Sequence, residues 1–148
     1  MRKRWLVLAA ACLAVAILAV PSSASAASKP LFAALSGANE VPAGDRNGGG
    51  SFTAVIKGRQ MCFGLAVKNI EDPMAAHIHK GRRGVNGDIV VTLVPPSDGD
   101  PGASSGCTRL TRRLVRAIRR NPGRYYVNVH TEDFPDGAVR GQLFARGA

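Results

Sequence analysis

The chain has 148 residues, a formal net charge of +10 and three cysteines. This length supports one compact domain, and a hydrophobic fraction of 45% excludes both a disordered chain and a membrane bundle. The obvious interpretation of the charge is a protein that binds nucleic acid or another anionic surface, and it depends on where the basic residues lie.

Residues 1–26 have the pattern of a secretory signal peptide. Three basic residues at 2–4 precede an uncharged apolar run at 6–20, and Ala-Ser-Ala at 24–26 offers small side chains for cleavage. Cleavage would remove three of the 20 basic residues. We therefore expect a secreted protein whose mature chain, 27–148, is one domain with its core at about 31–144 and without a stable membrane span.

Two alternatives exist for this first segment. An uncleaved membrane anchor needs roughly 20 apolar residues to span a bilayer, and the run at 6–20 is shorter. Lipoprotein processing at Cys12 is less favoured, because the preceding Ala9-Ala10-Ala11 lacks the usual branched residue.

Two cysteines, Cys62 and Cys107, remain after this segment. An even pair in an exported chain predicts a disulfide, and two free buried thiols are the alternative. Cys62 alternates with the apolar residues around it, so its side chain is expected to face away from the core, towards a covering segment.

Most of the mature chain predicts short strands. Short or alternating apolar runs place them at 31–36, 51–57, 60–68, 75–80, 88–94, 124–131 and 138–144. Gly58-Arg59 makes the second and third a hairpin, while Gly48–Gly50 and 97–106 are expected to be loops. The pattern predicts an all-β fold, an antiparallel Greek-key-like β-sandwich or barrel with one short amphipathic Arg-rich helix.

That helix is predicted by Leu110, Leu114, Val115 and Ile118, which follow helical spacing. Thr108 is expected to cap its start and the Asn-Pro-Gly at 121–123 to end it. Its other positions form a cationic face, namely Arg109, Arg112, Arg113, Arg116, Arg119 and Arg120.

This face has two interpretations. It is either a solvated helix surface or an attachment site for phospholipid, an acidic glycan or another anionic envelope polymer. Nucleic acid is not expected as a partner, because the chain is exported and no aromatic residues alternate with the arginines.

The three histidines form a second candidate site. His77 and His79 share one face of a predicted strand, and Tyr126, Asn128 and His130 share one face of another. If the two strands are neighbours, three imidazoles meet, and nitrogen ligands favour Zn²⁺ or Cu²⁺. The alternative is a polar cluster in which the histidines only donate and accept hydrogen bonds.

Catalytic machinery is otherwise not indicated. The Gly-Ala-Ser-Ser-Gly at 102–106 fits the Gly-x-Ser-x-Gly pattern but lies in the polar loop expected at 97–106, not between a strand and a helix as a nucleophile elbow does, and the glycine patterns that bind phosphate are absent. Glu40 and Arg140, with Asn128, are interpreted as a polar cluster in which the first two form an ion pair or hydrogen-bond to loops. We therefore do not expect an enzyme.

The order of several motifs resembles the chordin-type domain, CHRD, in its single-copy bacterial form. The motifs are the Leu-Ser-Gly-Ala-Asn-Glu-Val-Pro at 35–42, the Ala-His-Ile-His-Lys-Gly at 76–81, the segment 86–93, the stretch 121–131 with Asn-Val-His-Thr, and 134–143 with Arg-Gly-Gln-Leu. The resemblance covers about 31–144.

The resemblance implies an extracellular domain. In animals the domain is repeated in chordin, which restrains bone morphogenetic proteins, but that activity is not expected for one copy without chordin's cysteine-rich modules. The His-x-His strand is also loosely similar to copper/zinc superoxide dismutases, which use more histidines and an aspartate.

We thus expect an exported, non-catalytic extracellular or envelope-associated binding module, whose partner is an extracellular protein, a glycan or an anionic envelope polymer. The alternative is a metal-binding protein or a dismutase-like metalloenzyme that uses His77, His79 and His130.

Overall fold

Nine antiparallel strands form one continuous sheet in residues 29–146, the part of the chain that the computed structural model describes. The predicted signal peptide at 1–26 lies outside the described residues. The elements are β1 (Leu31–Ser36), β2 (Gly49–Lys57), β3 (Gln60–Lys68), β4 (Ala75–Lys80), β5 (Ile89–Leu93), β6 (Gly102–Arg109), α1 (Arg112–Arg120), β7 (Tyr125–His130), β8 (Val139–Gln142) and β9 (Phe144–Ala145). Two short 3-10 turns, at Gly37–Asn39 and Pro122–Arg124, complete them.

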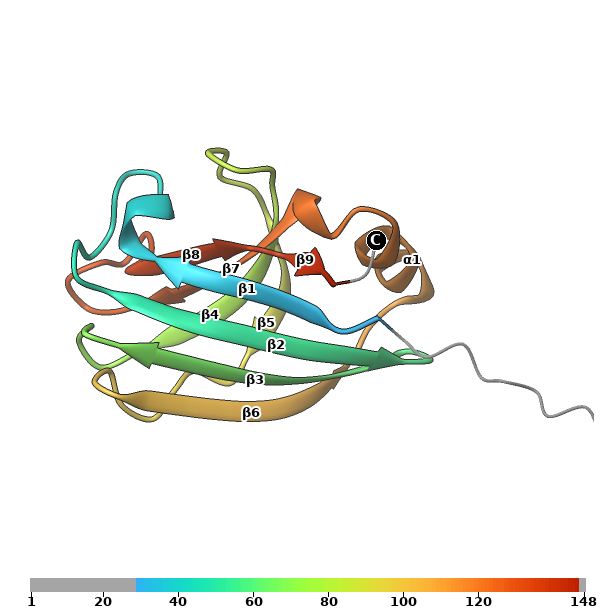
Figure 1. Cartoon of the computed structure of the whole chain (residues 1–148), viewed down its shortest axis with the longest axis horizontal. Helices are drawn as coiled ribbons and strands as arrows, with labels where there is room; N and C mark the ends of the chain where they lie inside the picture. Colours follow the sequence, from blue (N-terminus) through green and yellow to red (C-terminus); the bar gives the residue numbers. More distant parts are fainter. Residues whose placement is uncertain (1–28, 147–148) are drawn as a thin grey trace, which may run out of the picture.

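The sheet curls until its two edges approach each other. Its order is β5-β4-β7-β8-β1-β2-β3-β6, with β9 added beside β1, so β5 and β6 are the edges. The β6 residue Ser104 donates its hydroxyl to the Val94 carbonyl just after β5, at 2.7 Å. Figure 1 shows β1, β2, β3 and β6 in front of β4, β5 and β7. The predicted antiparallel sandwich or barrel is confirmed as a nearly closed barrel.

The core fills the space between the two halves of this barrel. On the β2–β3 hairpin, alternate residues such as Phe52 and Leu65 are buried while their neighbours are exposed. From the opposite half, Ile78, Val127 and Val129 are fully buried against them. The apolar residues that alternate along each predicted strand therefore lie on the face of that strand that packs into the core.

The expected loop at 97–106 is partly wrong, because its last residues begin β6. This strand reads Gly-Ala-Ser-Ser-Gly-Cys-Thr-Arg and its burial alternates weakly, so it has no apolar row to reveal it. It is an edge strand held by pairing with β3 from Gln60–Arg109 to Val67–Gly102. Gly48–Gly50 is likewise not only a loop, since Gly49 and Gly50 belong to β2.

The helix begins three residues later than predicted. Thr108 and Arg109 are the end of β6, and the Thr111 hydroxyl accepts the Leu114 N–H as the actual N-cap. The predicted end at Asn121 is confirmed. Threonine is a suitable N-cap residue at either position. Because Thr108 pairs with β3 as part of β6, Thr111 caps the helix.

No helix in the described residues is long and apolar enough to cross a bilayer.

Cys62 and Cys107 form the predicted disulfide. They are directly opposite each other in the β3–β6 pair, and both side chains are exposed. Cys62 therefore faces away from the core as predicted, but its partner lies on the neighbouring strand and not in a segment that covers the sheet. The bond fastens the edge strand that has no apolar row of its own.

Replacing both cysteines by serine is expected to lower the free energy of unfolding by about 4 kcal/mol, because the bond closes a loop of 45 residues in the unfolded chain. Urea unfolding of the double variant measures this. A loss below about 1 kcal/mol would contradict an entropic role for the bond and leave β6 held by backbone pairing alone.

Candidate metal centre

A polar face lies on the outside of β4, β7 and β8, opposite the core. The strand registers put His77 across from Asn128 and Asn128 across from Arg140. In the next row of the same face, His79 is across from Tyr126, and Tyr126 from Gln142. The condition set for the histidine site, that the two histidine-bearing strands are neighbours, is therefore met.

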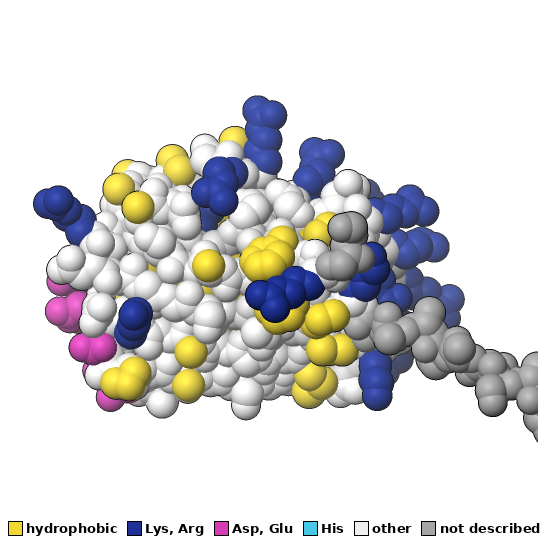
Figure 2. Space-filling view, viewed as in Figure 1, with side chains coloured by type: hydrophobic (Ala, Val, Ile, Leu, Met, Phe, Trp, Pro, Cys, Tyr) yellow, Lys and Arg dark blue, Asp and Glu magenta, His cyan; other side chains and the backbone are white. Residues whose placement is uncertain are grey.

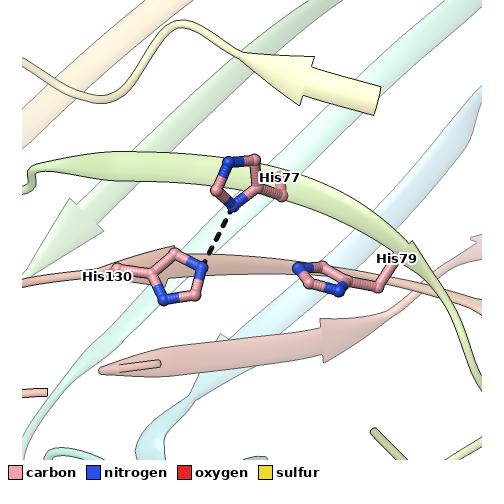
Figure 3. Close-up of side chains that lie close together, drawn as sticks. All are labelled: His77, His79 and His130. Atoms are coloured by element: carbon pink, nitrogen blue, oxygen red, sulfur yellow. Dashed lines mark hydrogen bonds between the residues drawn. The ribbon is translucent and has the colours of Figure 1, made fainter. Parts of the chain in front are cut away.

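The three histidines meet on this polar face. One ring nitrogen from each of His77, His79 and His130 lies within 4.8 Å of the other two. Nδ1 of His77 is 3.1 Å from Nε2 of His130, and Figure 3 shows this contact as a dashed line with the His79 ring beside it. Two nitrogens on one tetrahedral zinc ion are separated by about 3.3 Å, so this pair already has the spacing of ligands.

Backbone carbonyls fix the ring tautomers of two of these histidines. Nδ1 of His79 donates to the Gly87 carbonyl at 2.8 Å, and Nδ1 of His130 donates to the Pro135 carbonyl at 2.9 Å. A carbonyl only accepts, so in each neutral ring the lone pair is on Nε2. Histidines that bind metals commonly have their second nitrogen held in this way.

The lone pair of His79 has no partner. Its Nε2 is buried and makes no hydrogen bond of standard geometry, although the Asn128 side chain lies close enough to oppose the lowering of the His79 pKa. Glu40 Oε1 and Asn128 Oδ1 likewise make none, and these are the three buried side-chain atoms without a partner in the described part of the chain. Buried polar atoms are normally paired, so their concentration on one face indicates a site that a ligand completes.

Burial also keeps two of the rings neutral. It lowers the pKa of His77, and the neighbouring His130 and His79 lower it further. Burial lowers the pKa of His79 as well, although the Gly87 carbonyl partly opposes the shift. Neutral imidazole is the form that binds a metal, so the environment favours the binding-competent state at neutral pH.

Arg140 fastens the loop at 81–88 over this face. The side chain is 1% exposed. Its guanidinium donates to Asn86 Oδ1 at 3.0 Å, to the Arg82 carbonyl at 3.2 Å and to the Val85 carbonyl at 2.8 Å. The loop held in this way supplies the Gly87 carbonyl that orients His79.

Tyr126 connects Arg140 with the histidines. The Arg140 guanidinium carbon lies 3.3 Å from the centre of the Tyr126 ring, a cation–π contact. The His79 ring stacks on the same tyrosine with 4.8 Å between ring centres and planes 8° apart. The Tyr126 hydroxyl also accepts the Gly87 N–H. The orientation of His79 is therefore fixed by stacking and by a hydrogen bond.

Comparison with known families agrees with this arrangement. A family model described as the CHRD domain matches residues 31–143. The chain belongs to the CHRD family. Neither the curated proteins nor the solved structures give a match. In this CHRD domain, the residues of the polar face, and Asn86 and Gly87 of the loop above it, belong to motifs that carried the resemblance.

Glu40 is the acidic member of the predicted polar cluster of the CHRD domain. It is 6% exposed, and its carboxyl oxygens approach the backbone of Gly137 so closely that a Cβ there would lie 2.3 Å from Oε1. Burial raises the pKa of Glu40 to about 7, although Arg140, the Val41 backbone and Asn128 oppose the shift. Two roles are predicted for Arg140, an ion pair with Glu40 and hydrogen bonds to loops. Its hydrogen bonds go to the loop at 81–88, and the charge of the Glu40 carboxylate opposes the lowering of the Arg140 pKa by burial.

Glu40 gives the stability of the CHRD domain a pH dependence. The folded pKa of about 7 exceeds the ordinary glutamate pKa of 4.5, so the folded state binds this proton more tightly than the unfolded chain does. The stabilisation is complete below about pH 4.5 and lost as the pH rises through 7, a loss of about 3 kcal/mol. Glu40→Gln should remove it. Urea midpoints from pH 5 to 8 measure the difference, and parallel curves for the two proteins would contradict it.

The predicted cationic residues lie at one end of the CHRD domain, on two elements. Arg109 ends β6 and is not on the helix, whereas the other five are on α1. All six are exposed; the list is Arg109, Arg112, Arg113, Arg116, Arg119 and Arg120. Val115 and Ile118 bury the opposite side of the helix, and Arg119 donates to the Ile56 carbonyl at 2.8 Å.

Sequence reasoning missed the loop contacts of the CHRD domain. The Gln142 amide nitrogen, Nε2, lies 2.7–2.9 Å from the carbonyl oxygens of Gly81, Gly123 and Tyr125 as their shared donor. It thus connects the start of the loop at 81–88 with the start of β7. The available signal was the polar Arg-Gly-Gln at 140–142 within an apolar strand. Alternation puts Arg140 and Gln142 on the face of the histidines, where each needs partners.

Proposed function

We propose that this CHRD domain is an exported, non-catalytic binding module that holds one Zn²⁺ or Cu²⁺ ion on His77, His79 and His130. The observation that carries the proposal is the buried Nε2 of His79, which has no partner and points its lone pair into a group of three histidines. Such an atom costs free energy unless a ligand completes it.

The three rings differ in how ready they are to bind. The Nε2 lone pairs of His79 and His130 are set by their carbonyl partners. His77 donates its Nδ1 proton to His130, so a metal ion would replace this proton as the bridge between the two rings, with the His77 proton moving to Nε2. His79 would approach the pair by side-chain movement, because the nitrogens now span up to 4.8 Å.

Export is supported by two independent features. The segment 1–26 has the composition of a signal peptide, and Cys62 and Cys107 are joined in an exposed disulfide, which suits an oxidising compartment. An extracellular or envelope-associated location follows from the same features.

A binding role is favoured over catalysis by the donor set. The whole sequence has three histidines, fewer than a copper/zinc dismutase site uses. A tetrahedral site with three histidine ligands still leaves one position for water, which is the position that a metalloenzyme uses. An activity measurement therefore has to separate binding from catalysis. We expect the copper- and zinc-loaded protein to show no superoxide dismutation above that of a His77→Ala variant.

Calorimetric titration of the purified mature domain with Zn²⁺ and Cu²⁺ tests the proposal. We expect one ion per chain, no net release of protons at neutral pH because the His77 proton moves to Nε2 of the same ring, and reversal by a chelator. Absence of saturable binding for either ion would reject the metal site and leave the histidines as a hydrogen-bonded cluster.

A further inference from the structure

Charge is separated along the long axis of the molecule. Figure 2 shows lysine and arginine side chains gathered over the end where α1 lies, and aspartate and glutamate at the opposite end. The loops at 69–72 and 98–100, which contain four of the ten acidic residues, are joined there by the Ile70 N–H to Gly99 carbonyl bond. The carboxylates of these two loops are thus far from α1, whereas Asp88 lies beside Lys80, whose N–H donates to the Asp88 carbonyl at 2.9 Å.

Two hollows open at this cationic end. The first, of about 550 Å³, lies between α1 and the strands, and its lining residues are Lys80, Val90, Thr111, Arg113, Leu114, Ala117, Asn121, Arg124 and Tyr125. The second, of about 510 Å³, adjoins the disulfide and is lined by Lys57, Arg59, Gln60, Cys107, Thr108 and Arg109. Each has three cationic side chains and no acidic one.

The segment between β6 and α1 connects the two hollows. Thr108 and Arg109 line one, and Thr111 and Arg113 line the other. Arg59 holds this segment to the β2–β3 turn, because its Nε donates to the Leu110 carbonyl at 3.0 Å. A ligand long enough to occupy both hollows would cross a rigid, positively charged surface.

The first hollow has the mixed chemistry of a site for sugars. Its floor is apolar, with Val90, Leu114 and Ala117 available to the C–H faces of a ring. Thr111 and Asn121 offer a hydroxyl and an amide to sugar hydroxyls. Arginine pairs with carboxylate or sulfate through two parallel hydrogen bonds, which suits the charged groups of such a chain.

A membrane surface fits this end less well. The exposed positions of α1 are all arginine, so the helix offers no exposed apolar side chain to the lipid boundary. The two hollows have room for groups that project from a ligand. A flat layer of lipid headgroups has no such projecting groups.

We infer that the cationic end binds an anionic polysaccharide, with one sugar unit in the hollow beside α1 and a neighbouring charged unit in the hollow beside the disulfide. This inference does not depend on the metal site, whose residues lie on the polar face of β4 and β7. It puts the attachment site in the two hollows, which include Arg113 and Arg109 of the predicted cationic face, and it identifies the partner as an acidic glycan.

The test uses the purified mature domain and heparin, a sulfated polysaccharide, as the probe. Lys80→Gln, Arg113→Gln and Arg124→Gln together should weaken heparin binding about tenfold or more, since charge-assisted contacts are lost. The matched control combines Arg46→Gln, Lys68→Gln and Arg82→Gln, which removes the same charge from exposed positions outside both hollows. It should weaken binding less than about twofold. Equal losses would overturn the inference, because affinity would then follow net charge alone.

A charge-neutral variant tests the sugar part of the inference. Ala117→Leu fills the floor of the first hollow and keeps good helix propensity. It should weaken heparin binding about fivefold and leave inorganic polyphosphate binding unchanged, because only the sugar ring uses the floor. Unchanged heparin binding would overturn the inference, as would vesicles of anionic phospholipid that bind as tightly as heparin.

Discussion

Arg140→Ala is expected to lower the free energy of unfolding by about 5 kcal/mol and to release the loop at 81–88. The buried guanidinium makes three hydrogen bonds to that loop and one cation–π contact with Tyr126. Its removal takes this donor from Asn86 Oδ1 and the Val85 carbonyl, while the Arg82 carbonyl keeps the Val85 N–H. Since a domain of this size is stable by 5–15 kcal/mol, this one substitution removes a large part of the total.

Two further variants separate the causes of this loss. Arg140→Lys keeps the charge but has one ammonium in place of a planar group, so we expect about half the loss. Arg83→Ala removes an exposed arginine of the same loop and should change stability by less than about 1 kcal/mol. Urea unfolding measures stability, and hydrogen exchange at 81–88 reports the loop. A loss for Arg140→Ala as small as that for Arg83→Ala would contradict the proposed role.

Replacing any one of the three histidines by alanine is expected to weaken Zn²⁺ or Cu²⁺ binding by more than about 100-fold. Loss of a group that only orients a ligand costs 10–100-fold, and loss of the ligand itself should cost more. His79→Ala is the most direct of the three, because His79 contributes the buried Nε2, but it also removes the Gly87 hydrogen bond and the stacking on Tyr126, so its folding has to be checked.

The control for this series is Glu132→Gln, an exposed change two residues from His130 that keeps all three imidazoles. It should bind the ion as the unaltered domain does. Thermal melting in the presence of a chelator shows whether each variant still folds. If a folded His79→Ala variant binds the ion as tightly as Glu132→Gln, the three histidines are not the site.

The strands and the meeting of the histidines could be predicted from the sequence because both depend on alternation with a period of two. The alternate residues Phe52, Ala54 and Ile56 mark an inward row, and His77, His79 and His130 mark an outward one. Only the pairing of β4 with β7 had to be assumed. The disulfide followed from the number of cysteines, although their position on adjacent strands did not.

What the sequence did not reveal depends on contacts between distant segments. Strand β6 has small and polar residues and is held by β3 and the disulfide, so its own composition predicts a loop. The start of α1 depends on whether Thr108 pairs in a strand. The contacts of Arg140 with the loop at 81–88 and of Gln142 with Gly81 join positions more than 50 residues apart along the chain, and local patterns carry no sign of them.

Zinc K-edge anomalous scattering from crystals of the zinc-treated mature domain tests the metal centre most directly. The proposed site predicts one anomalous peak about 2.0–2.1 Å from a ring nitrogen of each of His77, His79 and His130. His79 and His130 should coordinate through Nε2 while their Nδ1 atoms keep the Gly87 and Pro135 carbonyls. A peak elsewhere, or none at these rings at saturating zinc, would contradict the proposed function.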